Sequence, residues 1–133
     1  MGLLIWTQRK LDYYAHRASL LKQNFVFDLR FFMEAKQFNP YFNRKLFIDK
    51  NGHIKKCLSH EKSFGRIDEV DLIEIVGSVE YQQLNIVNKD HIHGCKNCEY
   101  RYVCTDSRTP EPEQEGWKHN SDCLYHPATG IWT

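Results

Sequence analysis

Apolar residues recur at helical spacing in two segments of the chain. The first spans residues 7–23, where we predict a helix of about four turns with Thr7 as its N-cap. The second spans residues 68–79, where three acidic residues stand at the end that is positive in a helix. We expect the core-facing positions to be Leu11, Tyr14, Ala15, Ala18 and Leu21 in the first helix, and Val70, Ile73, Val76 and Gly77 in the second.

A β-hairpin is the clearest local prediction between these segments. Residues 45–49 and 53–57 flank Lys50-Asn51-Gly52, and Asn-Gly supplies the positive φ angles that a tight turn needs. Four further segments complete the pattern: a Phe- and Val-rich strand at 24–32, an irregular stretch around Asn39-Pro40 at 34–43, an extended run at 84–87 and a polar loop with two prolines at 109–116.

Together these elements predict an α+β fold in a single domain over residues 1–133. We expect three parts: an N-terminal helix and strand (1–42), a hairpin and helix (43–87), and a cysteine-rich, metal-binding segment with little regular structure (88–133). A chain of 133 residues suits one domain with a modest core.

Net charge and the N-terminus constrain the compartment and the partners. The formal charge of +1 does not indicate a nucleic acid or an anionic membrane as partner. The apolar stretch at 1–6 is too short for a signal peptide or a membrane span, so we expect a cytoplasmic protein. In that reducing compartment, five cysteines are more often ligands than disulfides.

Four cysteines in the last third form the strongest motif. Cys95-x-x-Cys98 is a two-thiolate turn that aims both sulfurs, and several backbone N–H groups, at one centre. Cys104 follows six residues after Cys98, so a short helix would return it to the same centre, and Cys123 completes the set. The spacing fits an iron–sulfur cluster or a zinc ion without distinguishing them.

Several other histidine, cysteine and basic residues could have either a structural or a functional role. His91 and His93, and likewise His119 and His126, are alternative ligands but are more often solvated. Cys57 stands alone and is predicted to be a buried structural cysteine. The basic cluster Arg44-Lys45 and Lys55-Lys56 is predicted to be a solvated edge, with docking of an acidic peptide as the alternative.

At these residues the chain resembles a SPASM domain, and more narrowly the SPASM protein of grasp-with-SPASM peptide-modification systems. The resemblance covers about residues 24–133. The segments that carry it are 43–49 (NRKLFID), 52–57 (GHIKKC), 63–67 (SFGRI), Lys89-Asp90, 95–108 (CKNCEYRYVCTDSR), 123–127 (CLYHP) and 130–132 (GIW).

This resemblance implies a SPASM-like domain that binds [4Fe–4S] clusters. Cys95, Cys98, Cys104 and Cys123 match the ligands of the second auxiliary cluster of the class, and Cys57 matches one ligand of the first. Tyr41 and Ser107 stand where the family tends to carry further cysteines, so the first site looks lost. The chain contains neither the Cys-x3-Cys-x2-Cys motif of radical-SAM enzymes nor an ATP-grasp ligase.

Three functional hypotheses follow from this sequence. The first is an accessory protein, not catalytic alone, that presents a precursor peptide to an ATP-grasp ligase or another maturation enzyme of ribosomally synthesised peptides, by strand addition at the hairpin edge. The second is a redox auxiliary domain that passes electrons to a radical reaction on another chain. The third is a zinc-stabilised protein-interaction module.

Overall fold

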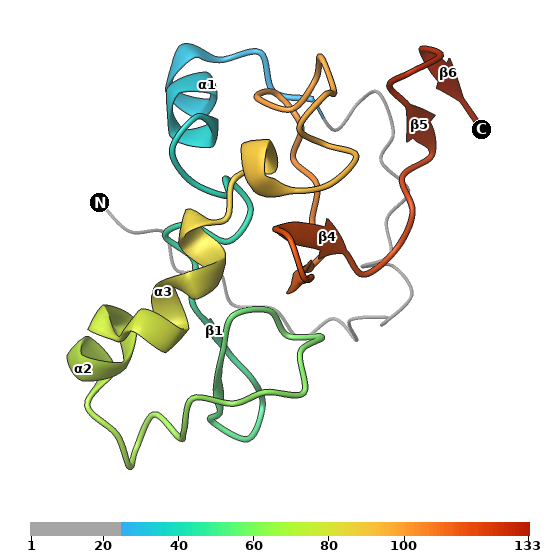
Figure 1. The fold of residues 1–133 in the computed structure, drawn as a ribbon. Coiled ribbons are helices and arrows are strands. Elements are labelled where there is room, and N and C mark those ends of the chain that lie inside the picture. Colours follow the sequence, from blue (N-terminus) through green and yellow to red (C-terminus); the bar gives the residue numbers. More distant parts are fainter. Residues whose placement is uncertain (1–24) are drawn as a thin grey trace.

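Three short α-helices and three two-stranded antiparallel hairpins make up residues 25–133, the part of the chain that this computed structural model describes. The arrangement confirms the predicted α+β fold (Figure 1). The helix predicted at 7–23 lies outside the described residues. In chain order the elements are α1 (Leu29–Ala35), β1 (Phe47–Ile48), β2 (Ile54–Lys55), α2 (Leu72–Gly77), α3 (Val79–Ile86), the 3₁₀ helix η2 (Lys89–His91), β3 (Pro110–Pro112), β4 (Trp117–His119), β5 (Tyr125–His126) and β6 (Ile131–Trp132).

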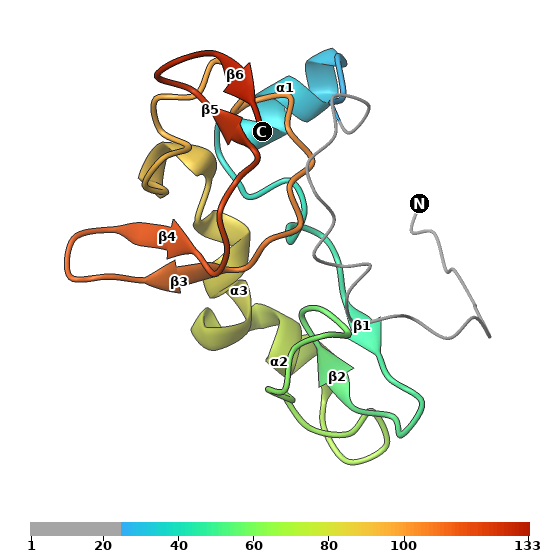
Figure 2. The same cartoon turned by 90° about the vertical axis from the view of Figure 1, so that its right-hand side faces the viewer.

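The hairpins lie at opposite ends of the molecule. The β1–β2 hairpin and α2 occupy one end, and the β5–β6 hairpin lies at the other (Figures 1 and 2). The β3–β4 hairpin projects from the side as an arm, which Figure 2 shows most clearly. None of the helices between residues 25 and 133 has the length and apolar character needed to cross a bilayer.

Helix α1 replaces most of the strand predicted at 24–32, so that prediction is wrong from Leu29 onward. Only the start is extended, where Phe25 bridges Cys104 and the Val26 N–H donates to the Val103 carbonyl. The Asp28 carboxylate accepts hydrogen bonds from the Arg30 and Phe31 N–H groups and caps the helix. This N-cap outweighed the β-propensity of the Phe-rich sequence.

The predicted β-hairpin is confirmed, with shorter strands than the sequence suggested. Phe47 pairs with Lys55 and Ile48 with Ile54. The Asp49 side chain accepts from the Asn51 and His53 N–H groups and holds the turn. Of the turn residues Gly52 alone has a positive φ, of 82°, so the expectation that Asn51 shares that conformation is wrong.

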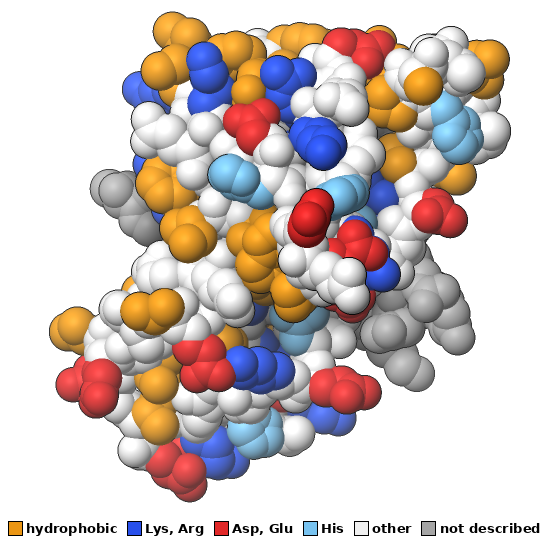
Figure 3. Space-filling model, viewed as in Figure 1, with side chains coloured by type: hydrophobic (Ala, Val, Ile, Leu, Met, Phe, Trp, Pro, Cys, Tyr) orange, Lys and Arg blue, Asp and Glu red, His pale blue; other side chains and the backbone are white. Residues whose placement is uncertain are grey.

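The helix predicted at 68–79 is divided into two. It begins after Asp71, whose side chain caps α2, and it breaks at Ser78, whose side chain caps α3. Because α3 continues to Ile86, the extended run predicted at 84–87 is wrong. The predicted core face is also wrong, since Ile73 is 85% exposed and α2 has no buried residue. Apolar side chains are visible on the surface over α2 in Figure 3.

A small core holds the hairpin end together around Phe42 and Ile54, both fully buried. The Asn39 side chain accepts from the Tyr41 and Phe42 N–H groups, which fixes the turn that delivers Phe42. The segment predicted to be irregular around Asn39 is therefore an ordered turn packed against α3, where the Asn39 N–H donates to the Asn85 carbonyl.

Lys56 belongs to this core, which corrects the prediction that it forms part of a solvated basic edge. Its ammonium donates to the Phe42 and Lys45 carbonyls at 2.9 and 3.1 Å and lies 4.2 Å from the centre of the Tyr81 ring. Burial lowers the pKa of Lys56 to about 8. Lys56, which directly follows β2, therefore links the end of that strand to the turn that precedes β1.

Replacing Lys56 tests this role. We expect Lys56→Ala to lower the free energy of unfolding by about 1–3 kcal/mol, because two buried carbonyls lose their charged donor. The exposed neighbour Lys50 is the control, and Lys50→Ala should change stability by less than about 0.5 kcal/mol. Denaturant unfolding of both variants measures the difference, and equal effects would contradict a buried structural role for Lys56.

Candidate metal centre

The first three cysteines lie on consecutive turns after η2. The carbonyl of fully buried Ile92 accepts from the Cys95 and Lys96 N–H groups, and the Cys95 carbonyl accepts from the Cys98 N–H. The segment from Cys98 to Cys104 continues in turns, so the short helix expected there does not form. Cys104 is instead held by its bridge to Phe25.

Backbone N–H groups lie near three of the four sulfurs. Burial raises the pKa values of Cys98 and Cys104, and the backbone N–H groups of Tyr100 and Asp106 oppose that rise. The Tyr125 N–H donates to the Cys123 sulfur at 3.4 Å. Backbone N–H groups that point at sulfur offset the charge of a thiolate, as in iron–sulfur proteins. These N–H groups lie outside the turn between Cys95 and Cys98, so the expectation that this turn aims its own N–H groups at the centre stays a prediction.

The four thiols are close enough to influence one another. Burial raises the pKa of Cys95 and of Cys98, and the neighbouring Cys123 thiol raises both further. Burial likewise raises the pKa of Cys104 to about 12, with a contribution from Cys95. The effect of Cys123 on the pKa values of Cys95 and Cys98 supports the prediction that the tail contributes the fourth ligand. Because thiols with raised pKa values stay protonated at neutral pH, a metal would have to displace their protons.

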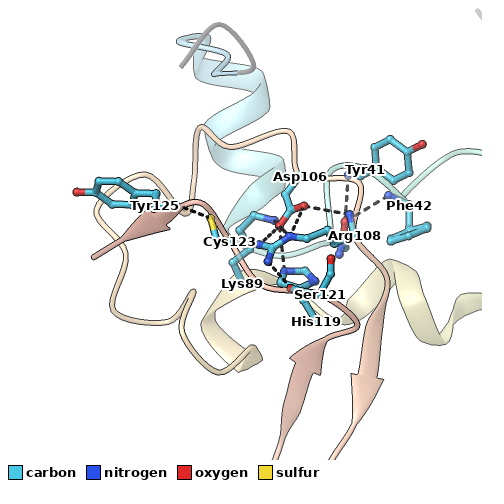
Figure 4. A network of polar contacts seen from close by, with 10 residues as sticks. Tyr41, Phe42, Lys89, Asp106, Arg108, His119, Ser121, Cys123 and Tyr125 are labelled. Atoms are coloured by element: carbon cyan, nitrogen blue, oxygen red, sulfur yellow. Dashed lines mark hydrogen bonds and ion pairs between the residues drawn. The ribbon is translucent and has the colours of Figure 1, made fainter. Parts of the chain in front are cut away.

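A network of buried charges, formed by Lys89, Asp106, Arg108 and His119, lies near Cys123 (Figure 4). The Arg108 guanidinium grips the Asp106 carboxylate with two nitrogens, at distances between 2.6 and 3.1 Å. Lys89 Nζ lies 3.7 Å from Asp106 Oδ2, and His119 Nε2 lies 3.1 Å from the same oxygen. Burial alone would raise the pKa of Asp106, but these three neighbours hold it well below its ordinary value.

The charges in this network do not balance. Two cations, Lys89 and Arg108, face one carboxylate, and burial lowers the pKa of His119 and so favours its neutral form. Among residues 25–133 the Lys89 ammonium has no hydrogen-bond acceptor, although only 2% of the side chain is exposed. The His119 ring contacts Asp106 through Nε2, and among residues 25–133 its Nδ1 has no hydrogen-bond partner. A buried positive charge without a hydrogen-bond acceptor, in excess over the one carboxylate it faces, suits an anionic centre.

The donor set fits a cluster better than a single zinc ion. Four thiolates on one zinc ion would lie about 3.8 Å apart, from Zn–S bonds of about 2.3 Å in a tetrahedron. Among residues 25–133, the ligand atoms gathered within 4.8 Å are those of Cys95, Asp106 and His119, not those of the four cysteines. A cluster places its own iron and sulfide between the thiolates, which spreads them apart. Asp106 is already bound by Arg108, which weakens the mixed set as a zinc site.

The four histidines proposed as alternative ligands separate into two groups. His91, His93 and His126 are exposed, and the His93 ring contacts the Glu115 carbonyl of the β3–β4 turn. Only His119 reaches the cysteines, because β4 carries it inward. The polar loop predicted at 109–116 thus contains strand β3 and the turn of a hairpin, which corrects that prediction.

Sequence reasoning did not assign a role to Lys89, Asp106 or Arg108. Each is a charged residue that hydropathy places at the surface, yet all three are buried. Their signal was present in the segments that carry the SPASM resemblance, which include Lys89-Asp90 and the run after Cys104. Only the fold shows that these segments meet.

The position of the first auxiliary cluster holds a different arrangement. Cys57 is 4% exposed and its sulfur lies 3.2 Å from the Ser59 hydroxyl. Tyr41 lies beside it, and burial together with the Cys57 thiol raises the pKa of Tyr41 to about 12. The prediction that Cys57 is a buried cysteine is confirmed, and its contact with Tyr41 was not foreseen.

Comparison with known proteins gives one match. Residues 40–99 match the model of the SPASM family, described as an iron–sulfur cluster-binding domain. The match covers less than half of the chain and includes Cys57, Cys95 and Cys98 but not Cys104 or Cys123. No curated protein and no solved structure matches the chain. The finding supports iron–sulfur binding and leaves the type of cluster and its complete ligand set as predictions.

Substitution of single cysteines tests the ligand set. We expect Cys98→Ser to abolish cluster binding and to lower thermal stability, since a cluster held by four thiolates loses one ligand. Cys57→Ser is the matched control and should retain the cluster. Iron and sulfide analysis with visible spectra after anaerobic purification measures both, and full iron content in Cys98→Ser would contradict the assignment.

Removal of the cluster should loosen one part of the chain. The segment 88–133 buries few large apolar side chains, chiefly Ile92 and Tyr125, whereas the hairpin end has its own core. Hydrogen exchange before and after chelation should therefore accelerate in residues 88–133 and remain nearly unchanged in residues 45–57. Equal acceleration of exchange in both regions would contradict the prediction that the cluster stabilises residues 88–133 selectively.

Proposed function

We propose that this chain is a cytoplasmic, non-catalytic accessory protein in the maturation of ribosomally synthesised peptides, built around one [4Fe–4S] cluster. Cys95, Cys98, Cys104 and Cys123 are its proposed ligands. The observation that carries the cluster is the buried Lys89 ammonium, which has no hydrogen-bond acceptor among residues 25–133 and shares its contact on Asp106 with the Cys95 sulfur. The match to the SPASM family supports the same chemistry.

The ligand set argues for an accessory role. Four thiolates leave no open iron position at which a substrate binds. The sequence also contains no Cys-x3-Cys-x2-Cys motif for cleavage of S-adenosylmethionine. The covalent step would therefore belong to a partner, either an ATP-grasp ligase or another maturation enzyme. The cluster, when bound, would order the last third of this chain.

The edge of β1 is the proposed peptide site. Ile54 of β2 already pairs on its other side, where its N–H donates to the Gly65 carbonyl and its carbonyl accepts from the Phe64 N–H. Among residues 25–133, β1 pairs with β2 alone, so its outer edge remains for an added strand. Ile48 on this strand is 46% exposed and offers an apolar contact.

The charges around this edge favour an acidic peptide. Arg44 precedes β1 and Lys50 follows it, and both side chains are exposed. Basic groups at both ends of an open strand edge would attract carboxylates of an incoming peptide and set its register. This surface retains the exposed part of the predicted basic cluster, without the buried Lys56.

A redox role is the second candidate. Cys98 and Cys123 are partly exposed, so a cluster held by them would lie near the surface, where electrons can pass to a partner. This alternative requires that the cluster be reversibly reduced. A bound cluster that accepts no electron from a low-potential reductant would remove it.

Titration with a precursor peptide encoded next to this chain tests the peptide site. We expect the double variant Arg44→Glu, Lys50→Glu to weaken binding about tenfold or more, because two attractive charges become repulsive. Lys96→Glu, an exposed charge reversal next to Cys95, is the control and should bind like the wild type. Absence of peptide binding by the wild type would count against the accessory role but not against the cluster.

A further inference from the structure

Lys89 occupies an unusual place for a lysine. Its position is fixed because Asn88 caps η2 through the Asp90 N–H and also donates to the Lys36 carbonyl at 2.8 Å. The side chain is 2% exposed, so the ammonium cannot reach water. Its nearest anionic partner, Asp106 Oδ2, lies 3.7 Å away, beyond hydrogen-bond distance.

Asp106 does not explain the burial of Lys89. That carboxylate already accepts several hydrogen bonds from the Arg108 guanidinium. With Arg108 paired to Asp106, the Lys89 charge remains as an excess in a dry pocket. An uncompensated buried charge costs several kcal/mol, so a protein that keeps one has an anion for it to face.

Lys89 lies beside the proposed ligands. Its Nζ is 3.7 Å from Asp106 Oδ2, and the Cys95 sulfur lies within 4.8 Å of a carboxylate oxygen of Asp106. In keeping with this position, burial raises the pKa values of Cys95, Cys98 and Cys104 and the Lys89 charge opposes that rise. Lys96, which follows Cys95 in the chain, is exposed instead.

We infer that Lys89 is the buried counter-ion of the iron–sulfur centre, a positioning residue that retains the cluster and raises its reduction potential. This inference rests on the proposed cluster. A cluster with four thiolate ligands carries net negative charge, and one-electron reduction adds another. A fixed positive charge at short range stabilises the reduced form more than the oxidised form. The same charge destabilises the protein when the thiols are protonated and no cluster is present.

The two states therefore predict opposite effects of one substitution. In the protein without cluster, Lys89→Met should be at least as stable as the wild type, because it replaces an unpaired buried charge with an apolar side chain of similar length. In the protein with cluster, Lys89→Met should lose cluster faster and shift the reduction equilibrium about tenfold toward the oxidised form, which is about 59 mV for one electron. A purely structural ion pair with Asp106 would weaken both states.

The experiment uses the full chain, reconstituted anaerobically with iron and sulfide. Lys89→Met, Lys89→Arg and the control Lys96→Met are compared in cluster content, midpoint potential by dye-mediated titration with dithionite, and thermal unfolding with and without cluster. We expect Lys89→Arg to restore most of the potential and Lys96→Met to match the wild type.

The outcomes separate the inference from the proposed function. A Lys89→Met variant with wild-type cluster content and potential would overturn the role of Lys89 and leave the cluster intact. So would a Lys89→Met protein that is less stable than the wild type in the absence of cluster. A wild-type chain that takes up no iron and sulfide would overturn the cluster itself, and the counter-ion with it.

Discussion

The last third of this protein depends on a balance between buried cations and sulfur. Between residues 88 and 133 the interior contains Lys89, Asp106, Arg108 and Cys104, with few large apolar side chains among them, and the other three thiols are partly buried. A hydrophobic core is stable without a partner, whereas buried charges are stable only when they are matched. The proposed cluster would supply the missing negative charge. Cluster binding and the stability of residues 88–133 are therefore expected to be coupled.

The geometry that closes the site comes from contacts outside the cysteines. The Tyr125 hydroxyl donates to the Glu99 carboxylate, which links the strand after Cys123 to the turn after Cys98. The Arg108 guanidinium donates to the Ser121 carbonyl at 2.7 Å and so holds the segment just before Cys123. These two hydrogen bonds, one before Cys123 and one after it, hold the segment that carries Cys123 in place.

The sequence predicted the features that local chemistry determines. The Asn51-Gly52 turn and the Cys95-x-x-Cys98 turn depend on neighbouring residues, and both form. The strand predicted at 24–32 was wrong because the Asp28 carboxylate caps a helix, a local signal that the apolar pattern concealed.

Features that depend on distant contacts were not accessible from the sequence. The sequence predicts Lys56 to be a surface lysine, whereas in the structure its ammonium contacts the Phe42 carbonyl and the Tyr81 ring. In the sequence, His119 could not be distinguished from the other three candidate histidines. In the structure, the β3–β4 hairpin places it near Cys95. Lys89 and Asp106 lie 17 positions apart, and no periodicity relates them. Long-range burial of charge leaves no pattern in hydropathy, so the charge network could be found only in the fold.

The region around Tyr41 and Cys57 is packed differently from the region around Lys89. In the family that this chain resembles, the region of Tyr41 and Cys57 would hold a first cluster. Here the Tyr41 ring packs edge-on against Phe42, with centres 5.0 Å apart, and Lys45 Nζ lies 4.1 Å from the centre of the Tyr41 ring. Aromatic and cation–π contacts thus surround Tyr41 at this end. The other end contains the buried Lys89 ammonium, which has no hydrogen-bond acceptor among residues 25–133, and that difference supports the proposal of a single cluster in residues 88–133.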